Sequence, residues 1–205
     1  DHTLIEKMCD RRFGIGGDGL ILLQNHEQYD FEMLYFNADG YEGSMCGNGG
    51  RCIVSFANFL GIIDHSTVFM AVDGIHEAKV AEGIVELKMV DINGVEAGEG
   101  SYFLDTGSPH YVRFVDDIAG FDVFEEGRKV RYSDRFKAVG TNVNFVQELE
   151  SGIKVATYER GVENETLSCG TGIVASSIVQ SIRSKKEGDF ETAIMAKGGN
   201  LKVHF

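Results

Sequence analysis

The sequence contains little proline, no basic cluster and no apolar run of membrane-spanning length. Pro109 is the single proline in 205 residues, and no stretch approaches the roughly 20 consecutive apolar residues that a membrane-spanning helix needs. Acidic residues number 32 and basic residues 19, so the formal net charge is −13. This excess of negative charge argues against binding to nucleic acid or to an anionic membrane surface. The composition is typical of a soluble globular protein that binds neither.

The four cysteines, Cys9, Cys46, Cys52 and Cys169, lack the CxxC spacing that is typical of zinc sites. We therefore expect no metal site. No signal peptide opens the chain, so we expect the reducing cytoplasm, where structural disulfides are uncommon. Glycine, by contrast, is abundant, and its 26 residues gather at a few places. Such clusters indicate tight turns or a close approach of the backbone to a ligand.

Hydrophobic periodicity predicts many short strands and two central helices. Strands are expected at 20–24, 29–37, 67–72, 75–80, 84–90, 140–149, 153–160, 190–196 and 200–205, with two more around the turn at 106–110. Helices are expected near 2–9, after Cys46, within 122–136 and at 170–182. Strands and helices do not alternate strictly, so we predict an α+β protein rather than a doubly wound sheet.

The helix after Cys46 is expected to be amphipathic and to span about three turns. Gly61 is its expected stop, and Cys52 is expected in the core. Its predicted buried face consists of Ile53, Phe56, Ala57 and Leu60. The polar, glycine-rich stretch 92–100 is a candidate linker. We therefore expect two similar lobes, 1–92 with Cys46 and 93–205 with Cys169.

An internal repeat joins these two cysteines. The pattern Glu-x-x-x-Cys-Gly-x-Gly begins at Glu42 and returns at Glu165, and an apolar helix of similar length follows each copy. A duplication with one thiol in each lobe is the simplest explanation. The N-terminus of a helix favours negative charge, because its first N–H groups lack intrahelical acceptors. Such a site lowers the pKa of a thiol from about 8.5 and can also hold a carboxylate.

A pair of opposed thiols around one carboxylate suits racemisation or epimerisation at an α-carbon. One thiolate removes the α-proton, and the other thiol returns a proton to the opposite face. The paired helix N-termini would stabilise the developing enediolate. No pyridoxal-phosphate lysine motif is evident, so the expected route needs no cofactor.

Other interpretations of these residues remain open. A cysteine before a glycine turn is often a small buried apolar residue, and Cys46 and Cys169 could instead form a disulfide. Cys9 and Cys52 lack the repeated context. The glycine loop at 14–19 precedes a strand rather than a helix, so it is a weak dinucleotide fingerprint and could be a simple turn.

The two cysteine stretches resemble a known family. YFNADGYEGSMCGNGGRC at 35–52 and YERGVENETLSCGTG at 158–172 are similar to the two signatures of the diaminopimelate epimerases. GIGGDG at 14–19, TGSPHYV at 106–112 and GTNVNFV at 140–146 match the intermediate motifs in order. The family interconverts LL- and meso-diaminopimelate without a cofactor, for lysine and peptidoglycan synthesis. The resemblance implies two pseudo-symmetric lobes, each a β-barrel-like sheet around a central helix, and a homodimer.

The resemblance also implies residue roles. Cys46 and Cys169 would be the acid/base pair. The backbone N–H groups offered to the carboxylate at the reacting centre would belong to Gly47, Asn48, Gly170 and Thr171. The distal end of the substrate would be held by Asn37, Asn142, Glu159 and Arg160, the last through its planar guanidinium. His110 and Glu159 would lie beside the thiols and influence their protonation.

Several of these residues could instead have purely structural roles. Asn37 and Asn142 could be turn residues, His110 could be structural, and Glu159 and Arg160 could form a solvated pair. Three features depart from the family pattern. Ser108 replaces a common asparagine and would reach the ligand only through a water or a shift, Gly19 replaces a common glutamine, and the spacer 161–166 is one residue longer. The family's opening Gly-Asn-Asp-Phe strand, with a substrate-contacting asparagine, and its closing strand lie outside 1–205.

Two other functions compete with diaminopimelate epimerisation. One is a proline or hydroxyproline racemase-like enzyme of the same fold, although those enzymes carry histidine where Asn48 stands. The other is a non-catalytic amino-acid-binding protein. Proton exchange into proline would support the first, and unreactive cysteines that substrate does not protect would support the second.

Overall fold

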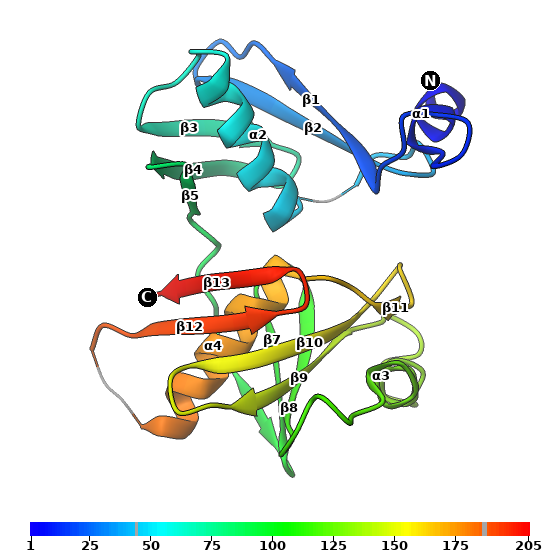
Figure 1. Ribbon diagram of the computed structural model, residues 1–205, viewed down its shortest axis with the longest axis vertical. Coiled ribbons are helices and arrows are strands. Elements are labelled where there is room, and N and C mark those ends of the chain that lie inside the picture. Colours follow the sequence, from blue (N-terminus) through cyan, green and yellow to red (C-terminus); the bar gives the residue numbers. More distant parts are fainter. Residues whose placement is uncertain (44, 186–187) are drawn as a thin grey trace. The chain divides into compact units, whose positions relative to one another are not determined.

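The computed structural model describes residues 1–43, 45–185 and 188–205, which form two compact units, Asp1–Met89 and Val90–Phe205. Each unit combines one sheet with a helix that packs against it (Figure 1). The predicted α+β class is therefore confirmed.

The N-terminal unit contains a five-stranded sheet in the order β1-β2-β3-β4-β5. Its elements are α1 (His2–Cys9), β1 (Gly19–Gln24), β2 (Phe31–Asn37), α2 (Gly47–Phe59), β3 (Ser66–Ala71), β4 (Gly74–Ala81) and β5 (Ile84–Leu87). Neighbouring strands are antiparallel except β2 and β3, which are parallel and are joined through α2. Helix α2 contacts both edge strands, β1 and β5, so the sheet curls around it (Figure 1).

The predicted buried face of α2 is correct for Ile53 and Ala57 and wrong for Phe56 and Leu60. Ile53, Val54 and Ala57 lie in the core with Phe31 and Phe69, as the spacing of three and four residues requires. The predicted core residues Phe56 and Leu60 are instead 49% and 50% exposed, and Cys52 is exposed as well. The prediction failed because the helix carries two apolar stripes, and 52, 56 and 60 form a second one at spacing i, i+4.

The C-terminal unit contains an eight-stranded sheet in the order β13-β12-β10-β9-β8-β7-β6, with β11 paired to β10. Its elements are β6 (Glu96–Gly98), β7 (Ser101–Asp105), β8 (Pro109–Phe114), α3 (Val123–Arg131), β9 (Asn142–Glu148), β10 (Ile153–Glu159), β11 (Asn164–Glu165), α4 (Gly170–Ser184), β12 (Glu191–Ala196) and β13 (Gly199–His204). The pairs β8/β9 and β10/β12 are parallel. Helix α4 contacts β7, β8, β9, β10 and β13, so this sheet also curls around its helix (Figure 1).

The stretch 92–100 is part of the C-terminal unit rather than a linker. It contains β6, which pairs with β7, and Ile92 and Val95 pack against the core of this unit. The sequence prediction failed here because polar and glycine residues hide a short edge strand. The two-residue strand β11 was also missed.

The repeat extends from the cysteine motif to the topology. In the N-terminal unit, the hairpin β1-β2 leads through α2 to β3, which is parallel to β2, and then to the antiparallel β4. In the C-terminal unit, β9-β10, α4, β12 and β13 follow the same sequence of pairings. Both sheets therefore present a helix N-terminus after the second strand of a hairpin.

Candidate active site

The same backbone pairing positions the glutamate of each motif. Glu42 bridges to Phe36 at the end of β2, and Glu165 pairs with Tyr158 at the end of β10. The residue after each glutamate donates its N–H back to the same strand: Gly43 to Tyr35 O at 2.9 Å, and Thr166 to Thr157 O at 3.0 Å. In both units this return of the chain against the strand precedes the cysteine.

Each cysteine is the N-cap residue of its helix. Cys46 precedes α2 and Cys169 precedes α4, both with extended backbone, and neither side chain caps its own helix. The Cys46 carbonyl accepts from Gly50 N–H at 2.7 Å, and the Cys169 carbonyl accepts from Ile173 N–H at 2.9 Å. The N–H groups before these positions have no acceptor within the helix, so each helix start is suited to an anion. All four cysteines are reduced thiols.

The residues at the two helix starts differ in exposure. Cys46 is half-buried, whereas Cys169 is only 8% exposed. Gly47 is buried and Gly170 is half-buried. Gly172 packs so closely on Asn144 that a Cβ atom would collide with Asn144 Oδ1. This contact explains the glycine at the second position after Gly170.

A buried network lies behind Cys169. Thr171 Oγ1 is 3.4 Å from Cys169 Sγ and 2.8 Å from Nε2 of His110, which is fully buried. Burial, together with the positive charge of Arg160, lowers the pKa of His110 from 6.5 to about 3, although a hydrogen bond with Asn144 opposes this shift. His110 is therefore neutral at pH 7 and is one hydroxyl group away from the thiol.

Asn142 connects two other predicted residues, Ser108 and Arg160. Its Nδ2 donates to Ser108 Oγ at 2.8 Å and to Pro109 O at 3.2 Å, while its Oδ1 accepts from Arg160 N–H at 2.9 Å. The side chain therefore holds the turn between β7 and β8 against the end of β10. Arg160 is exposed, and its Nη1 donates to Val139 O at 3.3 Å. Glu159, the last residue of β10, is half-buried.

A second, partly buried cluster supports the loop that carries Arg160, and no motif in the sequence predicts it. Glu163 accepts from Arg131 Nε and Gly161 N–H through Oε1, both at 3.2 Å, and from the Tyr158 hydroxyl through Oε2 at 3.1 Å. Burial would raise the pKa of Glu163, but these hydrogen bonds and the Arg131 charge hold it below its usual value. Burial and Glu163 raise the pKa of Tyr158 to about 12.

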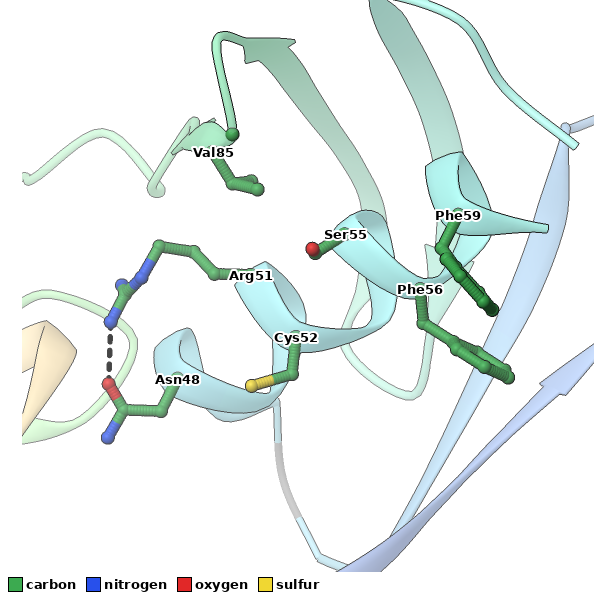
Figure 2. Close-up of a pocket in the computed structure, with 8 residues that line it drawn as sticks. Asn48, Arg51, Cys52, Ser55, Phe56, Phe59 and Val85 are labelled. Carbon is green, nitrogen blue, oxygen red and sulfur yellow. Dashed lines mark hydrogen bonds between the residues drawn. The ribbon is translucent and has the colours of Figure 1, made fainter. Parts of the chain in front are cut away.

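The N-terminal half-site is more open. Asn37 is exposed at the end of β2, and its N–H donates to Tyr41 O at 2.9 Å. Asn48 is exposed in the first turn of α2, where its Oδ1 accepts from Arg51 Nη2 at 2.6 Å (Figure 2). Asn48 and Cys52 line an open pocket of about 750 Å³ along α2, with Phe56 and Phe59 at its far end (Figure 2).

Arg51 also lines this pocket along α2, whereas Asn37 does not. The structure thus brings Ser108, Asn142 and Arg160 together, and likewise His110, Thr171 and Cys169. Residues that sequence reasoning missed are Asn144, Thr157, Arg131 and Glu163. A signal existed for Asn144, because Asn142 and Asn144 are two apart on β9 and so share one face of the strand.

Comparisons with known proteins assign the chain to a family. The model of the family described as diaminopimelate epimerase matches residues 1–100 and 102–205. The diaminopimelate epimerase of Flavobacterium psychrophilum is 50% identical over 205 residues, which are 99% of this chain and 80% of that protein. That of Chlorobaculum tepidum is 41% identical over 213 residues, with 100% and 83% covered. The chain belongs to the diaminopimelate epimerase family.

Solved structures place this diaminopimelate epimerase family member in a wider fold group. A Bacillus anthracis phenazine biosynthesis protein of the PhzF family matches with a TM-score of 0.70 at 14% identity, over 99% of this chain and 79% of that one. A probable proline racemase from Agrobacterium radiobacter, with bound carbonate, matches with a TM-score of 0.66 at 17% identity, over 98% and 71%. At these identities the likeness establishes the shared fold alone.

Across 1–43, 45–185 and 188–205, no three His, Cys, Asp or Glu side chains are grouped so that they could hold a metal ion. In the same part of the chain, no helix is both long and apolar enough to span a membrane.

Proposed function

We propose that this protein epimerises LL-2,6-diaminopimelate to meso-diaminopimelate with Cys46 and Cys169 as its two acid/base groups. The observation that carries the proposal is the repeated helix start: in a chain of this family, each of two glycine-led helices begins at a cysteine that does not cap its own helix. Such a position provides both a proton-transfer group and N–H groups for a carboxylate.

The reaction needs only a proton transfer on each side of the α-carbon. One cysteine, as thiolate, takes the α-proton and becomes a thiol, while the other gives its proton to the opposite face and becomes a thiolate. The negative charge that develops on the carboxylate is stabilised by N–H groups of Gly47, Asn48, Gly170 and Thr171. The route requires no cofactor.

We assign the distal amino-acid end of the substrate to the polar residues at the strand ends. Arg160 pairs with the distal carboxylate, and Asn37, Ser108, Asn142 and Glu159 complete the site. Both N–H groups of Asn142 are already donated to Ser108 and Pro109, so Asn142 offers the ligand only a lone pair on Oδ1. Ser108 accepts from Asn142 and keeps its own hydroxyl proton, with which it can donate to the ligand.

Proton exchange in D2O tests the function. LL-diaminopimelate and meso-diaminopimelate should each gain deuterium at the α-carbon and interconvert, whereas proline should gain none. Exchange into proline alone would favour the racemase-like alternative. Absence of exchange with every form of diaminopimelate, combined with saturable binding, would favour an amino-acid-binding protein.

Two further expectations, on the cellular compartment and the oligomeric state, accompany this proposal. The family resemblance implies that the protein acts in the cytoplasm and as a homodimer. Light scattering of the purified protein measures its mass in solution, and a monomer at working concentration would contradict the dimer without affecting the chemistry.

A further inference from the structure

We infer that Asn144 is a positioning residue, which acts through His110 to direct the hydroxyl proton of Thr171 at the sulfur that precedes α4. The inference rests on the proposed function, since it concerns the stabilisation of one of the two thiolates. It depends on five hydrogen bonds, and the donor of each follows in turn from one backbone carbonyl that can only accept.

The first step is the orientation of the Asn144 amide, which is fixed by a backbone carbonyl. Asn144 Nδ2 lies 3.1 Å from Tyr111 O, which can only accept. The other end of the amide, Oδ1, accepts from Thr157 Oγ1 at 2.9 Å. Rotating the amide by half a turn would bring two oxygens together at Tyr111, so the orientation is settled by chemistry.

The second step is the tautomer of His110. The same Nδ2 of Asn144 lies 3.0 Å from His110 Nδ1. An amide nitrogen cannot accept a hydrogen bond, so Nδ1 of the ring is the acceptor and carries no proton. Burial keeps the ring neutral, and its one proton is therefore on Nε2. The Nε2–H group donates to Thr171 Oγ1 at 2.8 Å.

The third step is the direction of the Thr171 hydroxyl. Because Oγ1 already accepts from His110, its own proton points to another acceptor, and Cys169 Sγ lies at 3.4 Å. The Thr171 backbone is also held, since Thr106 Oγ1 donates to Thr171 O at 2.9 Å. A hydroxyl group that donates to sulfur stabilises the thiolate more than the neutral thiol.

The other half-site has a different arrangement. The residue equivalent to Thr171 is Asn48, whose Oδ1 accepts from Arg51 Nη2 at 2.6 Å. At this position of the repeat the C-terminal half-site therefore carries a hydroxyl and the N-terminal half-site an amide, although the backbone of the repeat is the same. Asn144, Thr157 and His110 thus orient a hydroxyl donor toward Cys169, whereas the equivalent position after Cys46 carries the amide of Asn48.

Variants at Thr171 isolate the hydroxyl. Thr171→Val keeps the shape and removes the donor, whereas Thr171→Ser restores it. Loss of one hydrogen bond to a charged sulfur should reduce the thiolate population about tenfold at neutral pH. The remaining thiolate becomes about threefold more nucleophilic, so alkylation of Cys169 should slow about threefold relative to the exposed Cys52 in the same molecule. Thr171→Ser should restore both this ratio and kcat.

Asn144→Asp reverses the chain of hydrogen bonds with little change of shape. A carboxylate accepts from His110 Nδ1–H, so Nε2 becomes an acceptor for the Thr171 hydroxyl, and the sulfur loses its donor. Ser177→Ala is the matched control, because it removes a buried hydroxyl of α4 that donates at 2.9 Å to Ile173 O. This control should leave exchange and alkylation unchanged.

The ¹⁵N chemical shifts of His110 in the unmodified protein test the tautomer even if Asn144→Asp does not fold. They should show a protonated Nε2 and an unprotonated Nδ1. A protonated Nδ1, or Thr171→Val with an unchanged Cys169:Cys52 alkylation ratio, would overturn the inference. Neither readout requires turnover, so a protein that fails to exchange diaminopimelate would refute the proposed function while these results still decide the inference.

Discussion

Cys46 and Cys169 begin their helices in almost the same backbone conformation, with φ −111° and ψ 122° at Cys46 and φ −112° and ψ 112° at Cys169. The likeness includes the first helical hydrogen bond, which each cysteine carbonyl accepts from the residue four positions later. Two segments 123 residues apart in the chain (169 minus 46) thus offer the same arrangement of thiol and amides. A two-base reaction needs such duplication, since each face of the α-carbon requires its own acid/base group.

The first prediction is that the two thiols are not redundant. Cys46→Ala and Cys169→Ala should each lower kcat for epimerisation by about 10³-fold or more, because each removes the proton-transfer group for one face. Conversion of LL- to meso-diaminopimelate, followed by chiral chromatography, measures the loss.

The control for this prediction is Cys52→Ser. Cys52 is exposed on the second apolar stripe of α2 and has no cysteine equivalent in the repeat, so its substitution should leave kcat unchanged. A Cys46→Ala or Cys169→Ala protein that epimerises at the unmodified rate would show that the paired-thiol mechanism is wrong.

The second prediction compares the equivalent glycines of the repeat. Gly172→Ala would place a methyl group against Asn144 Oδ1, which cannot retreat because it is held by Thr157 and its amide by Tyr111. Gly49→Ala meets the flexible ends of two side chains, Ile21 Cδ1 at 3.0 Å and Met33 Cε at 3.3 Å. We expect Gly172→Ala to lower the free energy of unfolding by about 1–3 kcal/mol more than Gly49→Ala. Alanine improves helix propensity equally in both, so urea unfolding of the pair isolates the contact.

Equal effects of the two glycine substitutions would contradict this account of Gly172. Activity supplies a second comparison. Because the clash displaces the network behind Cys169, Gly172→Ala should also reduce kcat, whereas a purely structural effect would change stability alone.

These glycines also show what the sequence could and could not predict. The repeat of Glu, Cys and two glycines was readable from spacing, and it correctly predicted the helix after each cysteine. The reason for Gly172 was not readable, because it depends on Asn144, which approaches only after β8 and β9 pair in parallel. Long-range pairing of this kind has no local pattern. The prediction of which α2 residues are buried failed in part for a related reason. The helix carries two apolar stripes, and only packing against the curled sheet determines which one is buried.

The third prediction concerns Glu163, which holds the loop of Arg160. Glu163→Ala removes the acceptor of Arg131 and Gly161 and leaves the buried Tyr158 hydroxyl without its partner. We expect the free energy of unfolding to fall by about 1–3 kcal/mol, as for other unsatisfied buried groups. If Arg160 binds the distal carboxylate, KM for diaminopimelate should rise more than kcat falls.

Glu125→Ala is the matched control, because Glu125 is an exposed residue of α3 near the same cluster. It should change neither KM nor stability. A Glu163→Ala protein with unchanged KM would separate the loop from substrate binding and leave Glu163 with a structural role.

The fourth prediction is a loss of stability in mild acid that originates at His110. The folded protein holds the pKa of His110 at about 3, mainly through burial, whereas the unfolded value is 6.5. Between these values the unfolded chain binds a proton that the folded protein does not, so the free energy of unfolding falls as the pH decreases from 6.5 towards 3. The contribution is fully present above pH 6.5. With 1.36 kcal/mol for each pH unit, the loss between pH 7 and pH 5 is about 2 kcal/mol from this one residue.

His110→Gln removes the titration, so urea unfolding of the variant should show a loss about 2 kcal/mol smaller across the same interval. Carboxylates titrate in both proteins and cancel in the comparison. Parallel pH dependences for the two proteins would mean that His110 titrates in the folded protein as it does in the unfolded chain, which contradicts a ring kept neutral by burial.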